Sequence, residues 1–277
     1  MKFVTLPAGE RVSAFGMGTW YMGENRATRA EEMATLRLGL ELGASLIDTA
    51  EMYGEGLAEQ LVGEAIVGRR AEVFLVSKVY PHDATRSGAA LACERSLRRL
   101  RTDQLDLYLL HWRGNVPLAE TLEAFIALHE AGKIRHYGVS NLDIADMQEL
   151  WTLRGGQDVQ TDQVLYNLAR RGIEWDLLPS LREHGVPVMA YSPIERKALA
   201  EDQRLIAFAR RYGMTPAQVA IAWLLRNDDI IVIPKASNRQ HLIENVQALD
   251  IRLTREQLAE LDRMFSPPHG PRPLEMH

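Results

Sequence analysis

The stretch LIDTAEMYGEGLAEQLVGEAI, residues 46–66, begins as an apolar strand and ends as an amphipathic helix. Asp48 stands where the apolar run ends, and Tyr53 follows it in a turn that contains Gly54 and Gly56. A strand joined to a helix by a short turn is the repeating unit of α/β proteins. Because parallel sheets carry their chemistry where the strands end, the acid and the phenol are candidate functional residues.

The same pattern recurs along the whole chain. Runs that are apolar and mostly β-branched or aromatic, as buried strands should be, occupy residues 14–20, 45–50, 73–80, 105–112, 135–141, 159–166, 186–193 and 230–237. Helical patterns lie between them, for example at residues 31–43 and 118–133, and capping boxes begin at Thr215 and Thr254. We therefore predict an α/β fold, a single (β/α)8 TIM barrel over residues 1–277. A doubly wound dinucleotide-binding sheet is disfavoured, because residues 16–20 (GMGTW) lack its G-x-G-x-x-G motif.

The composition limits the possible partners. The chain has 277 residues and a net charge of −5, so no excess of basic residues indicates a nucleic acid or an anionic membrane. No apolar run reaches the roughly 18 residues needed to cross a bilayer, and no signal peptide is evident. The lone cysteine, Cys93, shares a helix face with apolar residues, which favours a buried, inert thiol. We expect a monomeric cytoplasmic protein that acts on a small molecule, with no metal site.

Polar side chains collect where the candidate strands end. They are Asp48, Lys78, His111, Ser140, Asn141, Gln163, Tyr191, Ser192 and Lys235, with Tyr53 just beyond Asp48. Each has a structural interpretation: Asp48 could cap a turn, Lys78 could be a solvated strand end, and His111 could be a hydrogen-bonded rim residue. A barrel, however, brings all of these positions to one mouth, and that convergence favours a functional site.

Seven short motifs match a known family. They are GTW (residues 18–20), IDTAEMY (47–53), SKV (77–79), LDLYLLHW (105–112), GVSN (138–141), YSP (191–193) and IPK (233–235). In this order and spacing they resemble the aldo-keto reductases across essentially the whole chain, and the sequence looks similar to small bacterial members that reduce methylglyoxal and other 2-oxoaldehydes. The resemblance implies a nicotinamide cofactor held without a Rossmann fold, and a catalytic tetrad of Asp48, Tyr53, Lys78 and His111.

The implied chemistry explains the spacing of Asp48 and Tyr53. Reduction of a carbonyl requires a hydride from the cofactor and a proton for the oxygen. Tyr53 would donate that proton, although a free tyrosine has a pKa near 10. We expect the charge of Lys78, about 4 Å away, to lower the pKa of Tyr53, and Asp48 to keep Lys78 protonated and in place. His111 would donate a hydrogen bond that orients and polarises the carbonyl.

By the same resemblance, the other mouth residues bind the cofactor. Tyr191 would stack on the nicotinamide ring, and Gln163 would bind the carboxamide together with Ser140 and Asn141; rim packing of Gln163 and Tyr191 is the alternative. The expected cofactor contacts are Gly18, Thr19, Trp20, Ser140, Asn141, Gln163, Tyr191, Ser192, Pro193, Ile194, Lys235, Ala236, Ser237, Asn238, Arg239, His241, Glu244 and Asn245. Residues 192–194 resemble the turn that contacts the pyrophosphate. The loop that follows, residues 195–202, is short, so we expect no long lid.

The cofactor preference depends on residues 235–241, where the family binds the adenosine 2′-phosphate. Lys235 keeps the expected cation, but Ala236 stands in place of the usual serine and His241 in place of an expected arginine. Arg239 is a possible substitute, unless it faces solvent and only Lys235 matters. Because a hydrogen bond to a charged group contributes about 1.5–3 kcal/mol, we expect NADPH to be preferred and NADH to be a weaker alternative.

The expected substrate pocket is an aromatic wall of Trp20, Tyr21, Tyr80 and Trp112, although Tyr80 and Trp112 could equally be rim packing. The C-terminal tail, residues 266–277, is short and Pro-rich, which predicts an open mouth that accepts small activated aldehydes.

Two other functions are possible for such a barrel. An aldolase-like enzyme would form a Schiff base on Lys78, which leaves the Asp48–Tyr53 pairing and residues 233–235 unexplained. A regulatory barrel that senses nicotinamide nucleotides, without a dedicated substrate, would usually carry partner-binding extensions. We therefore predict an NADPH-dependent oxidoreductase that reduces aldehydes and ketones, such as methylglyoxal, to alcohols.

Overall fold

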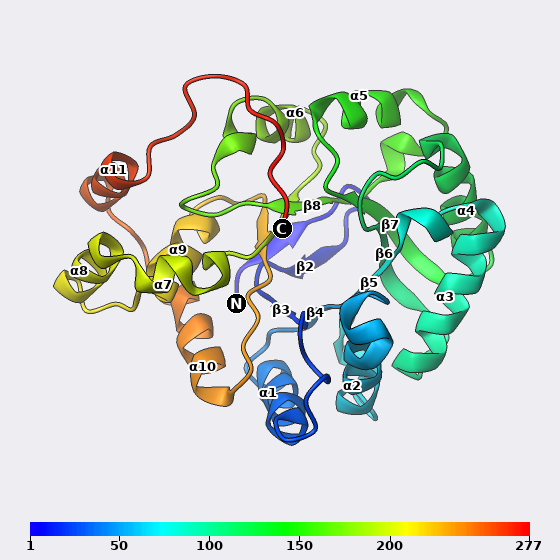
Figure 1. Cartoon of the computed structure of the whole chain (residues 1–277), viewed down its shortest axis with the longest axis horizontal. Helices are drawn as coiled ribbons and strands as arrows, with labels where there is room; N and C mark the ends of the chain where they lie inside the picture. Colours follow the sequence, from blue (N-terminus) through cyan, green and yellow to red (C-terminus); the bar gives the residue numbers. More distant parts are fainter.

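The computed structural model describes residues 1–277, apart from the side chain of Lys197, and it confirms the predicted barrel (Figure 1). Eight parallel strands form one sheet in the order of the chain. They are β3 (Gly16–Gly18), β4 (Leu46–Asp48), β5 (Phe74–Val79), β6 (Leu105–Leu110), β7 (Ile134–Ser140), β8 (Asp162–Leu165), β9 (Val188–Tyr191) and β10 (Ile230–Val232). A parallel bridge between Phe15 and Val232 joins the first strand region to the last and closes the barrel.

Helices alternate with the strands and surround them (Figure 1). They are α1 (Arg29–Glu41), α2 (Leu57–Ala65), α3 (Arg86–Leu100), α4 (Leu118–Glu130), α5 (Ile144–Thr152), α6 (Leu177–Glu183), α7 (Ala198–Glu201), α8 (Gln203–Arg211), α9 (Pro216–Leu225), α10 (Arg239–Gln247) and α11 (Arg255–Met264). The two helices expected at residues 31–43 and 118–133 are confirmed as α1 and α4, and both predicted capping boxes are formed. Among the described residues, no helix is long and apolar enough to span a bilayer.

The core confirms the prediction for the single cysteine. Cys93 in α3 is fully buried among apolar side chains. Burial raises the pKa of its thiol to about 12, so the thiolate is not formed near neutral pH.

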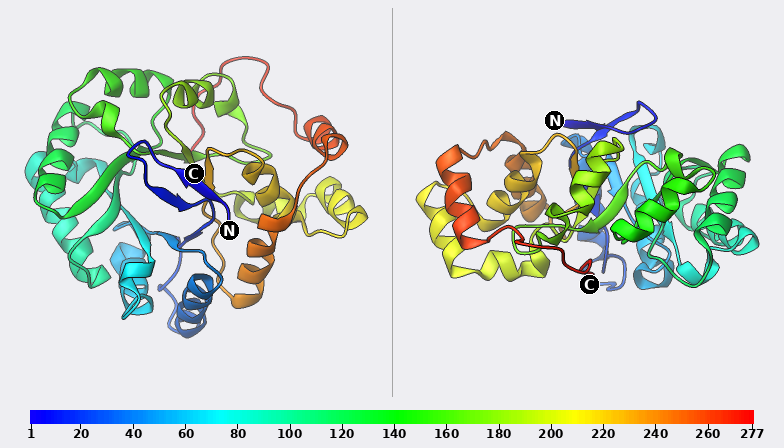
Figure 2. Two further views of the ribbon diagram at one scale, coloured as in Figure 1. Left: turned by 180° about the vertical axis from the view of Figure 1, so that it is seen from behind. Right: turned by 90° about the horizontal axis from the view of Figure 1, so that it is seen from above.

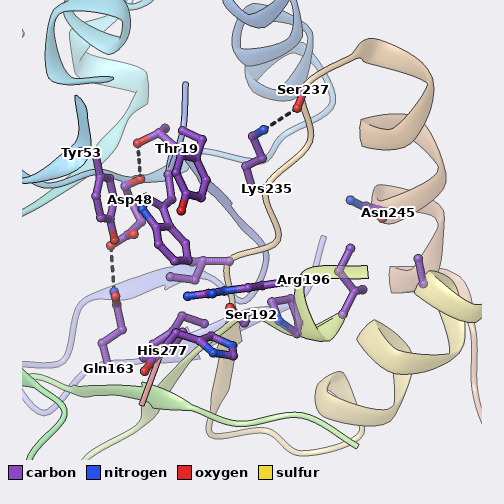
Figure 3. A pocket seen from close by; sticks show the side chains of 18 of the residues that line it. Thr19, Asp48, Tyr53, Gln163, Ser192, Arg196, Lys235, Ser237, Asn245 and His277 are labelled. Carbon is purple, nitrogen blue, oxygen red and sulfur yellow. Dashed lines mark hydrogen bonds between the residues drawn. The ribbon is translucent and has the colours of Figure 1, made fainter. Parts of the chain in front are cut away.

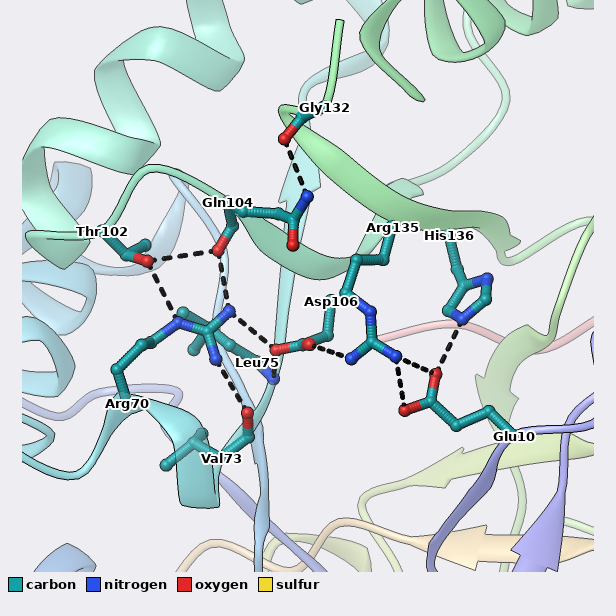
Figure 4. A network of polar contacts seen from close by, with 10 residues as sticks. All are labelled: Glu10, Arg70, Val73, Leu75, Thr102, Gln104, Asp106, Gly132, Arg135 and His136. Atoms are coloured by element: carbon teal, nitrogen blue, oxygen red, sulfur yellow. Dashed lines mark hydrogen bonds and ion pairs between the residues drawn. The ribbon is translucent and has the colours of Figure 1, made fainter. Parts of the chain in front are cut away.

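A two-stranded hairpin, β1 (Phe3–Thr5) with β2 (Arg11–Ser13), covers the N-terminal end of the barrel and was not predicted. The chain ends at the opposite face, so the two termini lie on opposite sides of the barrel (Figure 2). A partly exposed network of ion pairs around the buried Asp106 carboxylate fastens the hairpin (Figure 4). Arg135 in β7 binds Glu10 beside the hairpin at 2.8 Å and Asp106 in β6 at 2.7 Å, and Arg70 also pairs with Asp106 at 2.7 Å. The hairpin and its ion pairs thus occupy the N-terminal end of the barrel, and the loops after the strands lie at the other end.

Candidate active site

A cleft of about 770 Å³ opens at the C-terminal ends of the barrel strands, with Tyr53 and Asp48 at one end and Lys235 and Asn245 towards the other (Figure 3). The predicted residues that line it are Gly18, Thr19, Trp20, Tyr21, Asp48, Tyr53, His111, Trp112, Ser140, Asn141, Gln163, Tyr191, Ser192, Pro193, Ile194, Lys235, Ser237, His241, Glu244 and Asn245. Of the predicted residues, all of which the structure describes, five are outside this lining: Lys78, Tyr80, Ala236, Asn238 and Arg239.

Lys78 lies beneath the part of the cleft that Asp48, Tyr53 and His111 line, which we call the floor. It contacts its two expected partners, Asp48 and Tyr53. Its Nζ donates to both carboxylate oxygens of Asp48, at 2.7 and 2.9 Å, and to the backbone oxygen of Thr49 at 2.9 Å. The same ammonium group lies 3.2 Å from the hydroxyl oxygen of Tyr53. Lys78 is completely buried, because β5 carries it inside the barrel, while Asp48 ends the neighbouring strand β4. The acid, the amine and the phenol therefore form one hydrogen-bonded chain.

The expectation that Lys78 lowers the pKa of Tyr53 is wrong. Burial raises the pKa of Tyr53 well above its ordinary value near 10, and the negative charge of Asp48 adds to the shift. Burial also lowers the pKa of Lys78, with the Asp48 carboxylate opposing that shift. The physical reason is that Asp48 offsets the positive charge of Lys78, so desolvation decides the state of Tyr53. Tyr53 consequently keeps its proton over the whole neutral pH range.

His111 faces Tyr53 across the floor of the cleft. The two rings meet edge to face, with their centroids 5.8 Å apart. Burial lowers the pKa of His111 well below 6.5, and the nearby charge of Lys78 adds to the shift, so the imidazole is neutral near pH 7. Its Nδ1 atom is buried and has no hydrogen-bond partner among the described residues. Because His111 also lines the cleft, its ring can contact a molecule bound there.

The residues expected to bind a carboxamide form a network beside this floor. The hydroxyl group of Tyr191 donates to the side-chain oxygen of Asn141 at 2.9 Å, and the side-chain nitrogen of Asn141 donates to the hydroxyl oxygen of Ser140 at 3.0 Å. The side chain of Gln163 donates to the Asp48 carboxylate at 2.8 Å. Asn141 adopts a left-handed backbone conformation with φ of 58°, which few residues other than glycine tolerate. This network couples the amide-bearing side of the cleft to the tetrad.

Gly18 and Thr19 contribute mainly to the shape of the cleft wall. A Cβ atom at Gly18 would lie 2.7 Å from the backbone oxygen of Ile233, so only glycine lets β3 approach the segment after β10 this closely. The hydroxyl group of Thr19 is buried and donates to the backbone oxygen of Asp48 at 2.9 Å.

Three of the four residues predicted for the aromatic wall line the cleft, and Tyr80 does not. Trp20 and Tyr21 stack at 4.6 Å, and Trp20 lies 6.4 Å from Tyr53, measured between ring centroids. Trp112 also lines the cleft, whereas Tyr80 packs edge to face against it at 6.0 Å and does not reach the lining. The alternative of rim packing fits Tyr80 better than substrate contact does.

The opposite end of the cleft carries groups suited to an anion. Lys235 donates to the hydroxyl oxygen of Ser237, and both side chains line the cleft together with His241. The side chain of Asn238 caps α10 by accepting from the backbone N–H of His241 at 2.9 Å. The positive end of the α10 dipole therefore lies beside Lys235 and Ser237.

Arg239 does not join this group. Its guanidinium forms two 3.0 Å hydrogen bonds with Glu31 of α1, and its side chain is 58% exposed. Ala236 is buried and points no polar atom into the cleft. This arrangement agrees with the alternative in which Lys235, and not Arg239, provides the cation.

The structure also brings unpredicted residues to the cleft. Met276 and His277 of the C-terminal tail line the cleft, and the His277 ring lies 6.2 Å from the ring of Tyr191. The tail is fastened by an ion pair between Glu275 and Arg170 at 2.6 Å. No sequence signal announces these contacts, because the tail has no helical or strand period and its partners are distant in the chain. Arg196, in the short turn after β9, is a further unpredicted lining residue.

Comparison with known proteins places the chain in a family. A sequence model described as "Aldo/keto reductase family" matches residues 14–265. The chain is 48% identical to methylglyoxal reductase YeaE of Escherichia coli (strain K12), with 99% of each chain covered, and 31% identical to a glyoxal reductase of Bacillus subtilis (strain 168), covering 99% of this chain and 96% of the relative. It is 50% identical to an aldo-keto reductase from Klebsiella pneumoniae solved in complex with NADPH; the two structures superpose with a TM-score of 0.97, covering 100% and 99% of the chains. The chain belongs to the aldo-keto reductase family.

Proposed function

We propose that this aldo-keto reductase reduces small 2-oxoaldehydes such as methylglyoxal with NADPH, and that Tyr53 donates the proton. The observation that carries the proposal is the buried chain from Asp48 through Lys78 to the Tyr53 hydroxyl group at the floor of the cleft. His111 shares that floor in its neutral form. A carbonyl oxygen held between Tyr53 and His111 would have a proton donor and a hydrogen-bond donor on two sides.

The shape and chemistry of the cleft support a nicotinamide dinucleotide phosphate as the cofactor. One end offers the flat ring of Tyr191 and the amide and hydroxyl groups of Ser140 and Asn141, which suit an aromatic carboxamide. The other end offers Lys235, Ser237 and the start of α10, which suit a phosphate. When bound, NADPH supplies the hydride for the carbonyl carbon. Two Klebsiella pneumoniae structures at 50% identity are complexes with NADPH and with NADP and acetate, and they support this cofactor.

Tyr53, Lys78 and Asp48 have different roles in delivering the proton. Tyr53 holds a proton at its hydroxyl oxygen because burial disfavours the phenolate. As that proton leaves for the substrate oxygen, negative charge develops 3.2 Å from the Lys78 ammonium group, which stabilises it. Asp48 fixes the ammonium group through two hydrogen bonds, so the charge is in place before the reaction. The same arrangement disfavours the aldolase-like alternative, because a completely buried, hydrogen-bonded ammonium group is a poor nucleophile.

A small substrate fits the remaining space best. Trp20, Tyr21 and Trp112 line the cleft with aromatic surface, and Met276 and His277 of the tail line it as well. Relatives named methylglyoxal reductase and glyoxal reductase support a 2-oxoaldehyde.

The test is the loss of NADPH absorbance when purified protein is mixed with methylglyoxal and a panel of larger aldehydes and ketones. We expect turnover that is fastest, by kcat/KM, for the small activated aldehydes. The same assay with NADH should give a measurable but lower kcat/KM, because Lys235 can contact a 2′-phosphate that NADH lacks. A protein that binds NADPH but reduces no carbonyl would contradict the proposal and favour the nucleotide-sensing barrel.

A further inference from the structure

The side chain of Arg196 reaches across the cleft to Trp20. Its guanidinium carbon lies 4.4 Å from the ring centroid of Trp20, within the range of a cation–π contact. Trp20 follows β3 and Arg196 follows β9, and β10 lies between these two strands in the barrel. The contact therefore bridges the segment after β10, which carries Lys235, and Arg196 passes over the middle of the cleft (Figure 3).

The turn that carries Arg196 has an energetically unfavourable backbone conformation. Ser192, Glu195 and Arg196 have φ angles of 49°, 48° and 47°, a left-handed region that residues with side chains rarely adopt. Such conformations persist where the surroundings fix them, and they concentrate at functional sites. Here the buried Glu195 carboxylate fixes the turn by accepting from Asn167 at 2.6 Å and from Arg170 at 2.8 Å. The base of the turn is thus rigid, and the Arg196 side chain projects from it towards Trp20.

The charges in the cleft identify an anion as the ligand of Arg196. Among the described lining residues, Arg196 and Lys235 are the two with a permanent positive charge, and Lys235 lies at the phosphate-binding end beside Ser237 and α10. Arg196 forms no ion pair with the described residues. A dinucleotide that spans the cleft carries a pyrophosphate between its two ends, and the middle of the cleft is where Arg196 stands. A guanidinium, with its planar set of N–H donors, is well suited to two phosphate oxygens.

We propose that Arg196 is a one-residue clasp for the cofactor, which stacks on Trp20 across the cleft and binds the pyrophosphate of NADP(H) when the cofactor is present. This inference rests on the proposed use of NADP(H). The clasp takes the place of a long lid, which the short segment of residues 195–202 cannot form. Release of the cofactor then requires the contact between Arg196 and Trp20 to open, so the clasp acts mainly on the rate of dissociation.

The test compares Arg196→Ala with Arg196→Lys and with Arg26→Ala, which changes another exposed arginine outside the cleft lining. The dissociation constant is measured by calorimetry for NADPH and, as a probe without a pyrophosphate, for adenosine 2′-monophosphate. Arg196→Ala should weaken NADPH binding by about 10- to 100-fold, the range for one hydrogen-bonded charge, and leave the monophosphate affinity unchanged. Arg196→Lys should fall between Arg196→Ala and the wild type, because it keeps the charge and loses the planar stacking. Arg26→Ala should behave as the wild type.

A second readout follows the same variants without turnover. Stopped-flow displacement of NADPH should give a faster dissociation rate for Arg196→Ala, with the association rate little changed. Equal dissociation constants and rates for NADPH in Arg196→Ala and the wild type would overturn the clasp. Unchanged NADPH binding with a raised KM only for aldehydes that carry a carboxylate would also overturn it, and would assign Arg196 to the substrate. If the wild type bound no NADPH at all, the proposed function would fail first.

Discussion

Burial favours the neutral form of the ionisable groups around Tyr53. It raises the pKa of Tyr53 and lowers the pKa values of Lys78 and His111. Asp48 opposes the shift at Lys78 through its negative charge and two hydrogen bonds. The site therefore holds a protonated phenol and a neutral imidazole together, which are the states needed to give a proton and a hydrogen bond to a carbonyl oxygen.

The state of His111 predicts how the reaction depends on pH. Its pKa in the folded protein is lowered, so the ring takes up a proton only as the pH falls well below 6.5. The contribution of neutral His111 is thus retained above this range and lost only at lower pH. We expect kcat/KM for methylglyoxal to show no inflection near the ordinary histidine pKa when it is measured from about pH 5.5 to about pH 8. An inflection near pH 6.5 that disappears in His111→Asn would contradict this assignment.

At the residue scale, the sequence was sufficient for the positions of the tetrad but not for its electrostatics. Asp48, Lys78 and His111 end apolar strands, so a parallel barrel must bring them to one face. The pKa of Tyr53 could not be predicted in the same way, because it depends on burial and on how fully Asp48 offsets Lys78. Arg196 was missed because its contact with Trp20 joins residues far apart in sequence, through a turn with unusual φ angles.

At the scale of elements, β8 places a carboxyl group in the interior of the barrel. Asp162, the first residue of β8, is completely buried, and neither carboxyl oxygen makes a hydrogen bond of standard geometry with the described residues. Burial raises the pKa of Asp162 well above its ordinary value near 3.8, and the carboxylates of Asp146 and Asp143 add to the shift, although the backbone N–H of Leu142 opposes it. Asp162 therefore keeps its proton to a higher pH than an exposed aspartate does.

This predicts that Asp162→Asn stabilises the protein at neutral pH. A raised pKa in the folded state means that the stability from Asp162 is fully present below about pH 3.8 and is lost as the pH rises towards the folded-state pKa. Asparagine has a similar shape and does not titrate, so it avoids this loss. Urea unfolding at several pH values should show an advantage for Asp162→Asn at pH 7 that shrinks towards pH 4. An advantage that is independent of pH would exclude titration of Asp162 as its cause.

The elements differ in how far their sequences revealed them. The eight barrel strands were predictable because they lie in runs that are mostly apolar, β-branched or aromatic. The helix starts at Thr215 and Thr254 were predictable from their capping residues. The hairpin of β1 and β2 was not, since its strands, FVT and RVS, are short and lie in no continuous apolar run. The tail was also missed, because Glu275 and His277 are placed by single contacts with distant residues and by no period of their own.

At the scale of the whole molecule, the two ends of the barrel carry different features. The C-terminal end carries the cleft, the strained turns and the tail, whereas the N-terminal end carries the hairpin and its ion pairs (Figures 2 and 4). In barrels of this kind, side chains at the N-terminal end support stability and those at the C-terminal end support chemistry. A change at the N-terminal end should therefore alter unfolding without altering turnover.

Asp106 provides the test of that separation. Its buried carboxylate accepts from the backbone N–H of Leu75 at 2.8 Å and pairs with Arg70 and Arg135. Asp106→Asn removes the charge and leaves both arginines without this partner, so we expect a loss of roughly 1–3 kcal/mol in the free energy of unfolding. Because the arginines are partly exposed, the lower half of that range is favoured. The kcat for methylglyoxal should be unchanged below the unfolding temperature, and a kcat that falls with stability intact would contradict the separation.

The central claim joins the fold to the chemistry: the barrel places Tyr53 on a buried Lys78–Asp48 pair so that it can protonate a carbonyl oxygen. The most direct measurement is the kcat of Tyr53→Phe with methylglyoxal at saturating NADPH, beside its dissociation constant for NADPH. The variant keeps the ring and removes only the hydroxyl group, so cofactor binding should be nearly unchanged while kcat falls by roughly 10²–10⁴-fold. A variant that binds NADPH normally and turns over at close to the wild-type rate would show that Tyr53 is not the proton donor.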